Sequence, residues 1–443
     1  MPDVHAQSNS RATHASHSGE MVLARLPEIS GGAQLLRVVA GRQDAELIGG
    51  ATRDLLLART PKELDVVVES GAELLAQELA AALADAGASS DAGLQRGAHE
   101  RFETAFVSWR EGRIDITTRR GESYPSPGSL PDVRAGSPDD DLRRRDFTVN
   151  AIAVGLAGPR RAQLRSAPHS LEDLEAGRLR ILHERSFLDD PTRLLRLARY
   201  SARLGFEPEQ RTAQLAAEAL RAGALGSVSP ARIGAELRLA LREEDPVGSL
   251  VALAELGVLG ALDPPLSFSE QLARGGLAAL PADGRSDPLL LASLLVSLDP
   301  GDGAAREAAT KAFLDRLEFA ASDRERATRA ALRAPALVAA LAAARSPSQL
   351  RRSVRGEPLE AIALAAAMDE LQPPAPAASA ARRWLDELRH VRLQVTGDDL
   401  LSAGVAPGPE VGRLLDALLD MVLDGKLGDS REAQLQAALG ART

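Results

Sequence analysis

The chain has 443 residues, 44 % of them hydrophobic, which is enough for roughly two to four units with buried cores. Only 3 % are aromatic, so the packing must rest on Leu, Ala and Val, and the sequence is expected to be mostly helical. The absence of cysteine excludes disulfides, zinc–thiolate sites and a cysteine nucleophile. The net charge of -9 does not exclude a polyanionic partner, because local basic patches decide such binding.

No segment of the sequence indicates a membrane protein. The first twenty residues are polar and lack a signal-peptide apolar stretch, and no apolar run is long enough to span a bilayer. We therefore expect a soluble, cytoplasmic protein with no membrane partner.

The N-terminal half mixes strand and helix signals after a segment, 1–24, that we expect to be disordered. Strands are predicted over 45–50, 64–69, 102–109 and 113–118, with a further apolar segment at 146–156. Helices are predicted over 51–58 and 71–87. This pattern indicates a small α/β head.

The strand signal fades after about residue 170, so the predicted fold class is α+β, a small α/β head followed by helices. The stretch 373–380 reads as a linker, and a last pair of helices is predicted around 397–405 and 409–424. The predicted domains are a head (25–157), a helical neck (158–225), a helical body (226–372) and a helical tail (381–443).

The chemistry is carried by a glycine turn followed by two acids. Gly49 and Gly50 lie at a strand-to-helix turn, where backbone amides can approach a phosphate chain. Glu63 and Asp65 are two residues apart on the next strand, so their side chains point to one face. Two carboxylates there could hold two Mg²⁺ ions. Each half of the pattern alone would more often be a plain turn and a solvated strand end.

Asp115 is the candidate third acid, on a strand that could neighbour 64–69. The alternative is a strand-end aspartate in a salt bridge with Arg113, and the residues alone do not decide between the two.

The sequence resembles class II tRNA nucleotidyltransferases (CCA-adding enzymes) and bacterial poly(A) polymerases. Their Gly-Gly-x-x-Arg-Asp signature is matched by Gly49, Gly50, Arg53 and Asp54. Asp65 matches the second acid of their Asp-x-Asp, whereas the first acid is Glu63 in place of aspartate. The resemblance implies that Glu63, Asp65 and Asp115 are catalytic, that Glu63 and Asp65 bind metal, and that Gly49, Gly50 and Arg53 lie near the nucleotide triphosphate.

Further stretches carry the same resemblance, at 99–105, 115–133 and 144–151. It implies that Arg145 and Asp146 hold the sugar and phosphates of the incoming nucleotide. The alternative for these residues is a local ion-pair network where head and neck join.

The segment 186–196 resembles the family's nucleotide-selecting motif. Asp190 and Arg193 share a helix face and would read the edge of a base, with Arg196 also assigned to nucleotide binding. The alternative is an ordinary helix start, with Asp190 as a cap and Pro191 in the first turn.

In the tail, Gly397, Gly408 and Gly412 fall where the family's C-terminal domain begins two helices, whose amides could hold RNA phosphates. The alternative is a plain helix hairpin.

The activity implied is an enzymatic one, addition of CCA from CTP and ATP to the 3′ end of tRNA with Mg²⁺. Partial A or CC addition, poly(A) tailing, and a non-catalytic RNA-binding relative are the alternatives; only Glu63 favours the last. A fused His-Asp phosphohydrolase is disfavoured, because His390 is the only histidine after His183. Oligomeric state does not follow from the sequence.

Overall fold

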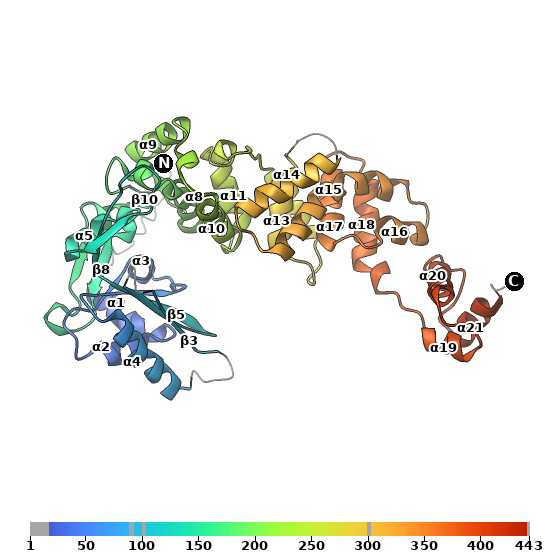
Figure 1. Cartoon of the computed structure of the whole chain (residues 1–443), viewed down its shortest axis with the longest axis horizontal. Helices are drawn as coiled ribbons and strands as arrows, with labels where there is room; N and C mark the ends of the chain where they lie inside the picture. The colour runs from blue at the N-terminus through green and yellow to red at the C-terminus, as the bar shows by residue number, and fades with distance from the viewer. Residues whose placement is uncertain (1–16, 88–92, 100–102, 299–302, 441–443) are drawn as a thin grey trace, which may run out of the picture. The chain divides into compact units, whose positions relative to one another are not determined.

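The computed structural model describes residues 17–87, 93–99, 103–298 and 303–440. The chain divides into two compact units, Met1–Arg193 with Leu204–Ala219 and Leu194–Arg203 with Leu220–Thr443. Figure 1 draws the first mainly in blue to green and the second mainly in green to red. The finer division into head, neck, body and tail stays a prediction. No helix within the described ranges is long and apolar enough to cross a membrane.

The first unit contains the β-structure. Its main strands are β1 (Glu46–Ile48), β2 (Leu64–Val68), β3 (Gln95–His99), β4 (Thr104–Trp109), β5 (Gly112–Thr118), β8 (Ile152–Gly155) and β9 (Leu164–Ser166). They form one sheet in the order β3-β4-β5-β2-β1-β8-β9. Only β2 and β5 pair in parallel; the other neighbours are antiparallel. Two-stranded sheets are made by β6 (Arg120–Ser123) with β7 (Asp132–Ala135) and by β10 (Arg178–Leu179) with β11 (Glu207–Pro208).

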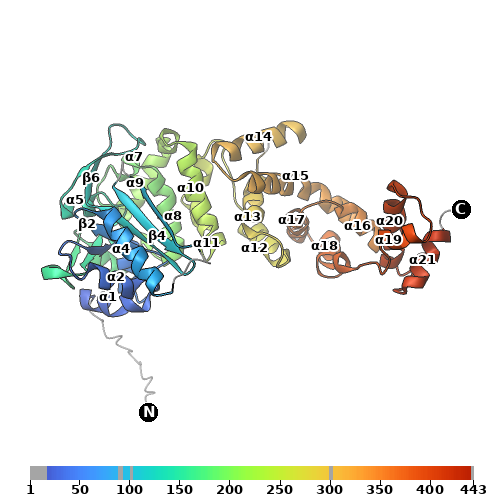
Figure 2. The ribbon, with the colours of Figure 1, turned by 60° about the horizontal axis from the view of Figure 1, so that its bottom comes forward.

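Helices also belong to this unit. They are α1 (Gly19–Arg25), α2 (Gly32–Val39), α3 (Gly50–Leu56), α4 (Ala72–Asp85), α5 (Pro138–Arg143), α6 (Ser170–Ala176), α7 (Ser186–Asp189), α8 (Thr192–Leu204) and α9 (Gln210–Arg221), with α8 and α9 extending into the second unit. In Figure 2, α2 and α4 lie together against the sheet, where Leu35, Val39, Leu75 and Leu79 are buried.

The acidic residues of the candidate site lie on the face of the sheet opposite α2 and α4. Strand β2 forms because its run Leu-Asp-Val-Val-Val is rich in β-branched residues. Its side chains alternate between faces, so Asp65 shares a face with Val67. Val67 packs in a core cluster with Ile48, Leu142 and Ala151. The carboxyl group of Asp65 therefore lies on the side where α5 and the chain after it run.

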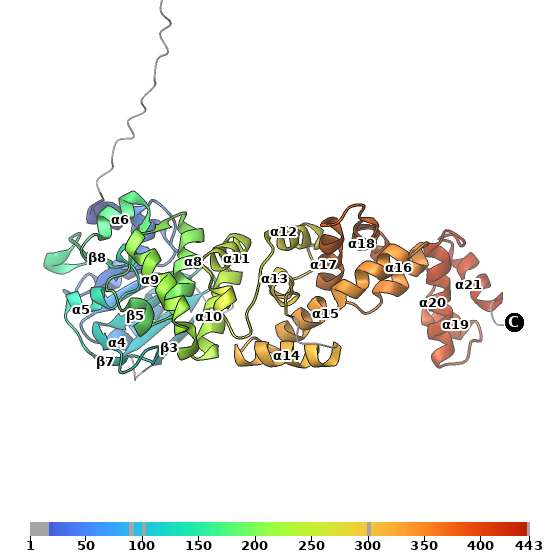
Figure 3. The same cartoon turned by 90° about the horizontal axis from the view of Figure 1, so that it is seen from above.

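The second unit is helical in its described residues. Beyond the shared helices it contains α10 (Pro230–Leu241), α11 (Pro246–Glu255), α12 (Glu270–Ala279), α13 (Ser286–Leu295), α14 (Gly303–Arg316), α15 (Ala321–Ala343), α16 (Pro347–Val354), α17 (Leu359–Glu370), α18 (Pro376–Asp386), α19 (Gly397–Ser402), α20 (Pro409–Leu423) and α21 (Arg431–Gly440). Helices α14 and α15 run side by side in Figure 3. The predicted α+β fold class is confirmed.

Three sequence predictions need correction. The sequence predicts disorder over 1–24, but Gly19–Arg25 forms α1; Ser18 caps the helix, and Val22 and Leu23 are buried. Residues 1–16 lie outside the described residues. The prediction of a linker at 373–380 is wrong, because α18 begins at Pro376 and buries Ala377, Ala378 and Ala381. The predicted last pair of helices is followed by a third, α21.

Candidate active site

Three carboxylates gather at one end of the central strands. Asp65 of β2 and Asp115 of β5 are register partners in the parallel pair, as the sequence predicted for neighbouring strands. Glu63 lies just before β2, two residues from Asp65, so it points to the same face. The two predicted metal ligands and the predicted third acid therefore share one surface.

This surface has an excess of negative charge. The pKa of Asp65 is raised to about 7, chiefly by burial and also by the charges of Glu63 and Asp115, while Arg145 and Arg53 act in the opposite direction. A carboxyl group in this situation gains from a bound cation. Carboxylate oxygens are hard ligands, so Glu63 and Asp65 fit a magnesium ion that completes its shell with phosphate oxygens and water.

Asp115 is already engaged by a cation. Arg113 donates from Nε to Asp115 Oδ2 over 2.7 Å and from Nη2 to Oδ1 over 2.6 Å. The salt bridge weighed as an alternative for Asp115 is thus present alongside its place next to Asp65. Within the part of the chain that the structure describes, no three acidic or histidine side chains form a ready metal cluster. The candidate metal ligands remain the predicted pair, Glu63 and Asp65.

The glycine turn brings backbone close to both an arginine and an acid. Gly49, after β1, has φ +74°, a left-handed conformation that favours glycine. A Cβ at Gly49 would lie 2.7 Å from Arg145 Nη1 and 3.4 Å from Asp65 Oδ2. A Cβ at Gly50 would have more room, since its nearest neighbour, Arg53 Nη2, would be 3.6 Å away. Gly49, Asp65 and Arg145 thus converge on one point.

Arg53 is enclosed and does not reach outward. Its side chain is 1 % exposed, donates from Nε to Asp54 Oδ1 over 2.8 Å, and makes a short hydrogen bond from Nη1 to Asn150 Oδ1. Asn150 in turn donates from Nδ2 to Asp146 Oδ1 over 2.9 Å. Arg53 and Asn150 thereby link α3, the helix after the glycine turn, to Asp146, the predicted sugar-binding residue. Asn150 was not among the predicted site residues, although the Asn of the Arg-Arg-Asp-Phe-Thr-x-Asn-Ala stretch is a signal for it.

Arg144 and Arg145 share a buried acid. Asp141 is 0 % exposed and accepts from Arg144 Nη2 over 2.8 Å and from Arg145 Nη2 over 3.3 Å. Burial alone would raise the pKa of Asp141, but Arg145 and Arg144 hold it below its usual value. Arg144 also donates to Glu122 over 3.1 Å. The ion-pair network weighed for these residues exists, and it fixes Arg145 beside Gly49.

The predicted base-reading pair lies at the start of α8. Arg193 is 3 % exposed and donates to Ser186 Oγ over 2.6 Å and to the Arg144 carbonyl over 2.8 Å. Asp190 accepts from the Thr192 amide over 3.1 Å, so its capping role is also present.

The surroundings of the pair add an aromatic residue. Tyr124 has its pKa raised to about 12, first by burial and then by Glu122 and Asp190, with Arg193 acting in the opposite direction. Tyr124 therefore lies near both members of the pair. Arg196, on α8 in the second unit, donates from Nε to Glu236 Oε1 over 2.7 Å.

The tail glycines differ in their surroundings. Thr396 and Asp399 form a capping box around Gly397 at the start of α19. Gly408 caps α20 with φ +141° and no side-chain cap, and Gly412 lies inside that helix with open space around it. RNA binding by these residues stays a prediction.

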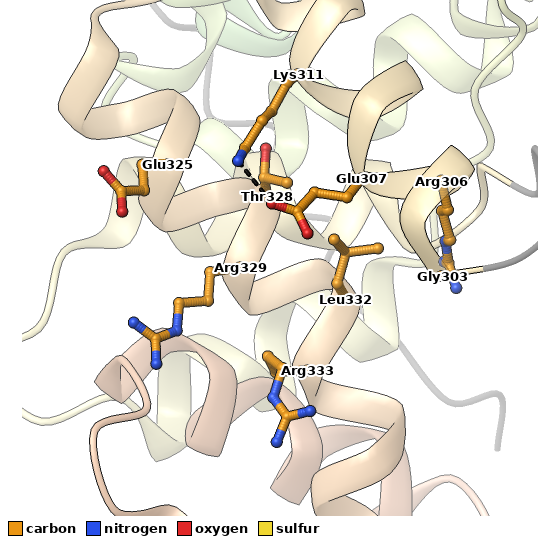
Figure 4. A pocket seen from close by; sticks show the side chains of 9 residues that line it. All are labelled: Gly303, Arg306, Glu307, Lys311, Glu325, Thr328, Arg329, Leu332 and Arg333. Atoms are coloured by element: carbon orange, nitrogen blue, oxygen red, sulfur yellow. Dashed lines mark hydrogen bonds and ion pairs between the residues drawn. The ribbon is translucent and has the colours of Figure 1, made fainter.

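A hollow of about 460 Å³ lies between α14 and α15 (Figure 4). Lys311 donates to Glu307 over 2.6 Å, while Arg329 and Arg333 both donate to Glu357. These three cations are already engaged by acids, and Arg306, which also lines the hollow, donates to the Val296 carbonyl over 3.0 Å.

The mixed sheet, its glycine turn and the carboxylates on the next strand define a catalytic head of the nucleotidyltransferase type. Residues 45–180 match the family model of the poly A polymerase head domain. A CC-adding tRNA nucleotidyltransferase of Deinococcus radiodurans is 33 % identical over 435 residues, 96 % of this chain and 98 % of the relative. The chain belongs to the class II tRNA nucleotidyltransferase family.

Two further likenesses agree with this assignment. An A-adding tRNA nucleotidyltransferase of Halalkalibacterium halodurans is 40 % identical over 251 residues, and the match spans 56 % of each chain. The solved structure of a CCA-adding enzyme in an apo form superposes with a TM-score of 0.75 at 27 % identity, covering 96 % of this chain and 99 % of that one.

Proposed function

We propose that this enzyme adds nucleotides without a template to the 3′ end of tRNA, using CTP and ATP, and that it completes the CCA sequence. The observation that carries the proposal is the convergence of Gly49, Asp65 and Arg145, which joins a phosphate-approaching turn, a carboxylate and a cation at one point. The names and the full-length similarity of the relatives support tRNA as the acceptor.

In this proposal the nucleotide is held by the residues around the glycine turn. Gly49 and Gly50 leave room for the triphosphate, and Arg145 binds its charge. Asp146, oriented by Asn150, accepts from a ribose hydroxyl. Arg53 acts indirectly, since its guanidinium holds Asn150 in place and is not exposed to the triphosphate.

Base choice is assigned to Asp190 and Arg193, which present an acceptor and fork-like donors. Their hydrogen bonds to Thr192 and Ser186 fix both side chains in position. A base edge would meet a rigid pattern, which can imitate a template base.

Transfer consists of in-line attack by the 3′-hydroxyl of the RNA on the α-phosphorus of the nucleotide, forming a phosphodiester bond and releasing pyrophosphate. Glu63 and Asp65 would hold two Mg²⁺ ions, which when bound supply charge neutralisation and a lowered pKa for that hydroxyl. Arg145 adds positive charge beside Gly49, where the phosphates would lie.

A partial activity is the second candidate, because the full-length relative is a CC-adding enzyme and another relative is an A-adding enzyme. To decide, the purified protein with Mg²⁺ is given tRNA lacking CCA, tRNA ending in CC, and complete tRNA, with CTP, ATP or both. Products are resolved at single-nucleotide resolution.

Two C and one A followed by a stop would support CCA addition, whereas CC alone or A alone would assign half of a split pathway. Long A tails would indicate a poly(A) polymerase. No incorporation by a folded protein that still binds tRNA would refute the catalytic proposal.

A further inference from the structure

Arg113 is held in place from two sides. Its guanidinium makes the two-pronged salt bridge to Asp115 and lies 4.3 Å from the centroid of the Phe106 ring. Phe106 is the register partner of Asp115 on β4, and Ser108 is that of Arg113, so the three side chains form one cross-strand group. The cation is thus oriented by β-sheet geometry.

The salt bridge occupies both oxygens of Asp115. Each oxygen keeps a further lone pair, but Arg113 neutralises the charge of the carboxylate and fixes its orientation, so Asp115 is a weaker metal ligand while the salt bridge is made. Arg113 also lies one residue before Ile114, the partner of Leu64, so it stands at the same end of the strands as Glu63. Its pKa is raised, chiefly by the hydrogen bond to Asp115 and also by the charges of Asp115, Glu63 and Asp65, with burial acting against this.

We propose that Arg113 is a positioning residue of the metal site: it engages both oxygens of Asp115, leaves Glu63 and Asp65 as the main protein ligands, and weakens divalent-cation binding by the free enzyme. The inference rests on the proposed function only in placing metal at Glu63 and Asp65. The ion pair between Arg113 and Asp115 would then control how readily the site binds a divalent cation before the nucleotide arrives.

The charge arithmetic supports this assignment. Three carboxylates face three arginines, Arg113, Arg145 and Arg53. Two of these already pair with other acids, Arg145 with Asp141 and Arg53 with Asp54. Removing Arg113 would free the Asp115 carboxylate and delete a positive charge beside the ligands, and both changes favour a divalent cation.

The test measures Mn²⁺ binding to the full chain by electron paramagnetic resonance, without RNA or nucleotide. Arg113→Ala should lower the dissociation constant about fivefold to tenfold. Arg113→Lys, which keeps the charge without the two-pronged geometry, should give a smaller gain. Arg110→Ala, which removes the same charge from the exposed turn of this hairpin, should leave the constant within about twofold of wild type.

The same substitution in Asp115→Asn protein separates the effect of the salt bridge from the effect of the Arg113 charge alone. In Asp115→Asn protein, Arg113→Ala should lose most of its gain, because no carboxylate remains to be released. An unchanged or weaker affinity in Arg113→Ala, or an equal gain in both backgrounds, would overturn the proposal. Melting curves of each variant check folding. Tighter Mn²⁺ binding in a protein that adds no nucleotide would refute the proposed function and leave this inference standing.

Discussion

Gly49 and Arg145 are in such close contact that a methyl group on Gly49 would lie 2.7 Å from a guanidinium nitrogen. The two residues are 96 positions apart in the sequence, yet they bring the turn after β1 and the chain after α5 together. A side chain at Gly49 would therefore displace the cation assigned to the nucleotide phosphates.

We expect Gly49→Ala to lower the free energy of unfolding by about 1–3 kcal/mol, because φ +74° is strained for any other residue and Arg145 must move. Gly50→Ala is the matched control for stability, since its nearest neighbour is at an ordinary 3.6 Å. Urea unfolding of both variants measures the difference. Equal stabilities would contradict the strain argument.

The metal-free stability should depend on pH through Asp65. Its pKa is about 7 in the folded protein against 3.8 when unperturbed, so the folded state binds more protons between these values. The stabilising contribution is present at pH 4 and is lost as pH rises through 7. Asp65→Asn should therefore stabilise EDTA-treated protein at pH 8, by on the order of 2–4 kcal/mol, and change it little at pH 4.

Thermal melts of wild type and Asp65→Asn at the two pH values provide the measurement. The contributions of the other acids cancel, because both proteins contain them. Mg²⁺ at pH 8 should raise the melting temperature of wild type more than that of the variant. A pH-independent difference between the two proteins would show that Asp65 titrates normally.

Nucleotide choice should depend on the two-pronged geometry of Arg193. Arg193→Lys keeps the charge but loses the fork, so discrimination between CTP and ATP should fall about 10-fold to 100-fold, the loss of about 1–3 kcal/mol. Ser186→Ala removes one hydrogen-bond partner of Arg193 and leaves the guanidinium. Discrimination between CTP and ATP is expected to change by less than about threefold. The ratio of kcat/KM values for the two nucleotides tests this, and an unchanged ratio in Arg193→Lys would remove the base-reading role.

The tail offers a comparison of two glycines near one helix start. Gly408→Ala should destabilise the protein by about 1–3 kcal/mol because φ is +141°. Gly412→Ala, inside α20 with nothing near it, should stabilise it by about 0.5–1 kcal/mol. Filter binding with tRNA then tests whether Gly412 contacts RNA, independently of its effect on stability. Weaker tRNA binding by the stable Gly412→Ala protein would place RNA at this residue. Unchanged binding would show that Gly412 is not part of the RNA interface.

The local features of the head were predictable from sequence because they are encoded within a few residues. The glycine turn and the Leu-Asp-Val-Val-Val strand specify their own conformations, and the position of Asp115 beside Asp65 followed from one further strand. The partners of Arg53 were not predictable in the same way. Its hydrogen bond to Asn150 joins residues 97 positions apart, and only the folded sheet brings them together.

Composition misled where packing decided the outcome. The stretch 373–380 has the prolines and alanines of a linker, yet Pro376 suits the first turn of a helix and the alanines fit closely against α17. The prediction of a helical second half was correct, but the prediction of a linker within it was not. For Asp115, the sequence left a salt bridge and an active-site role open, and the structure shows that one residue meets the geometry of both.

The position of α18 bears on how the protein can be dissected. Cleavage within 373–380 would strip the α17 face of the helix that covers it and leave buried alanines facing water. The truncated protein that keeps the head would be prone to aggregation, and its loss of activity would be mistaken for a requirement for the tail. A cut after the short helical turn Leu388–His390 keeps α18 in place and removes α19 to α21. Its main cost is the contact of α20 with α16, where Arg351 pairs with Asp416 and Asp420.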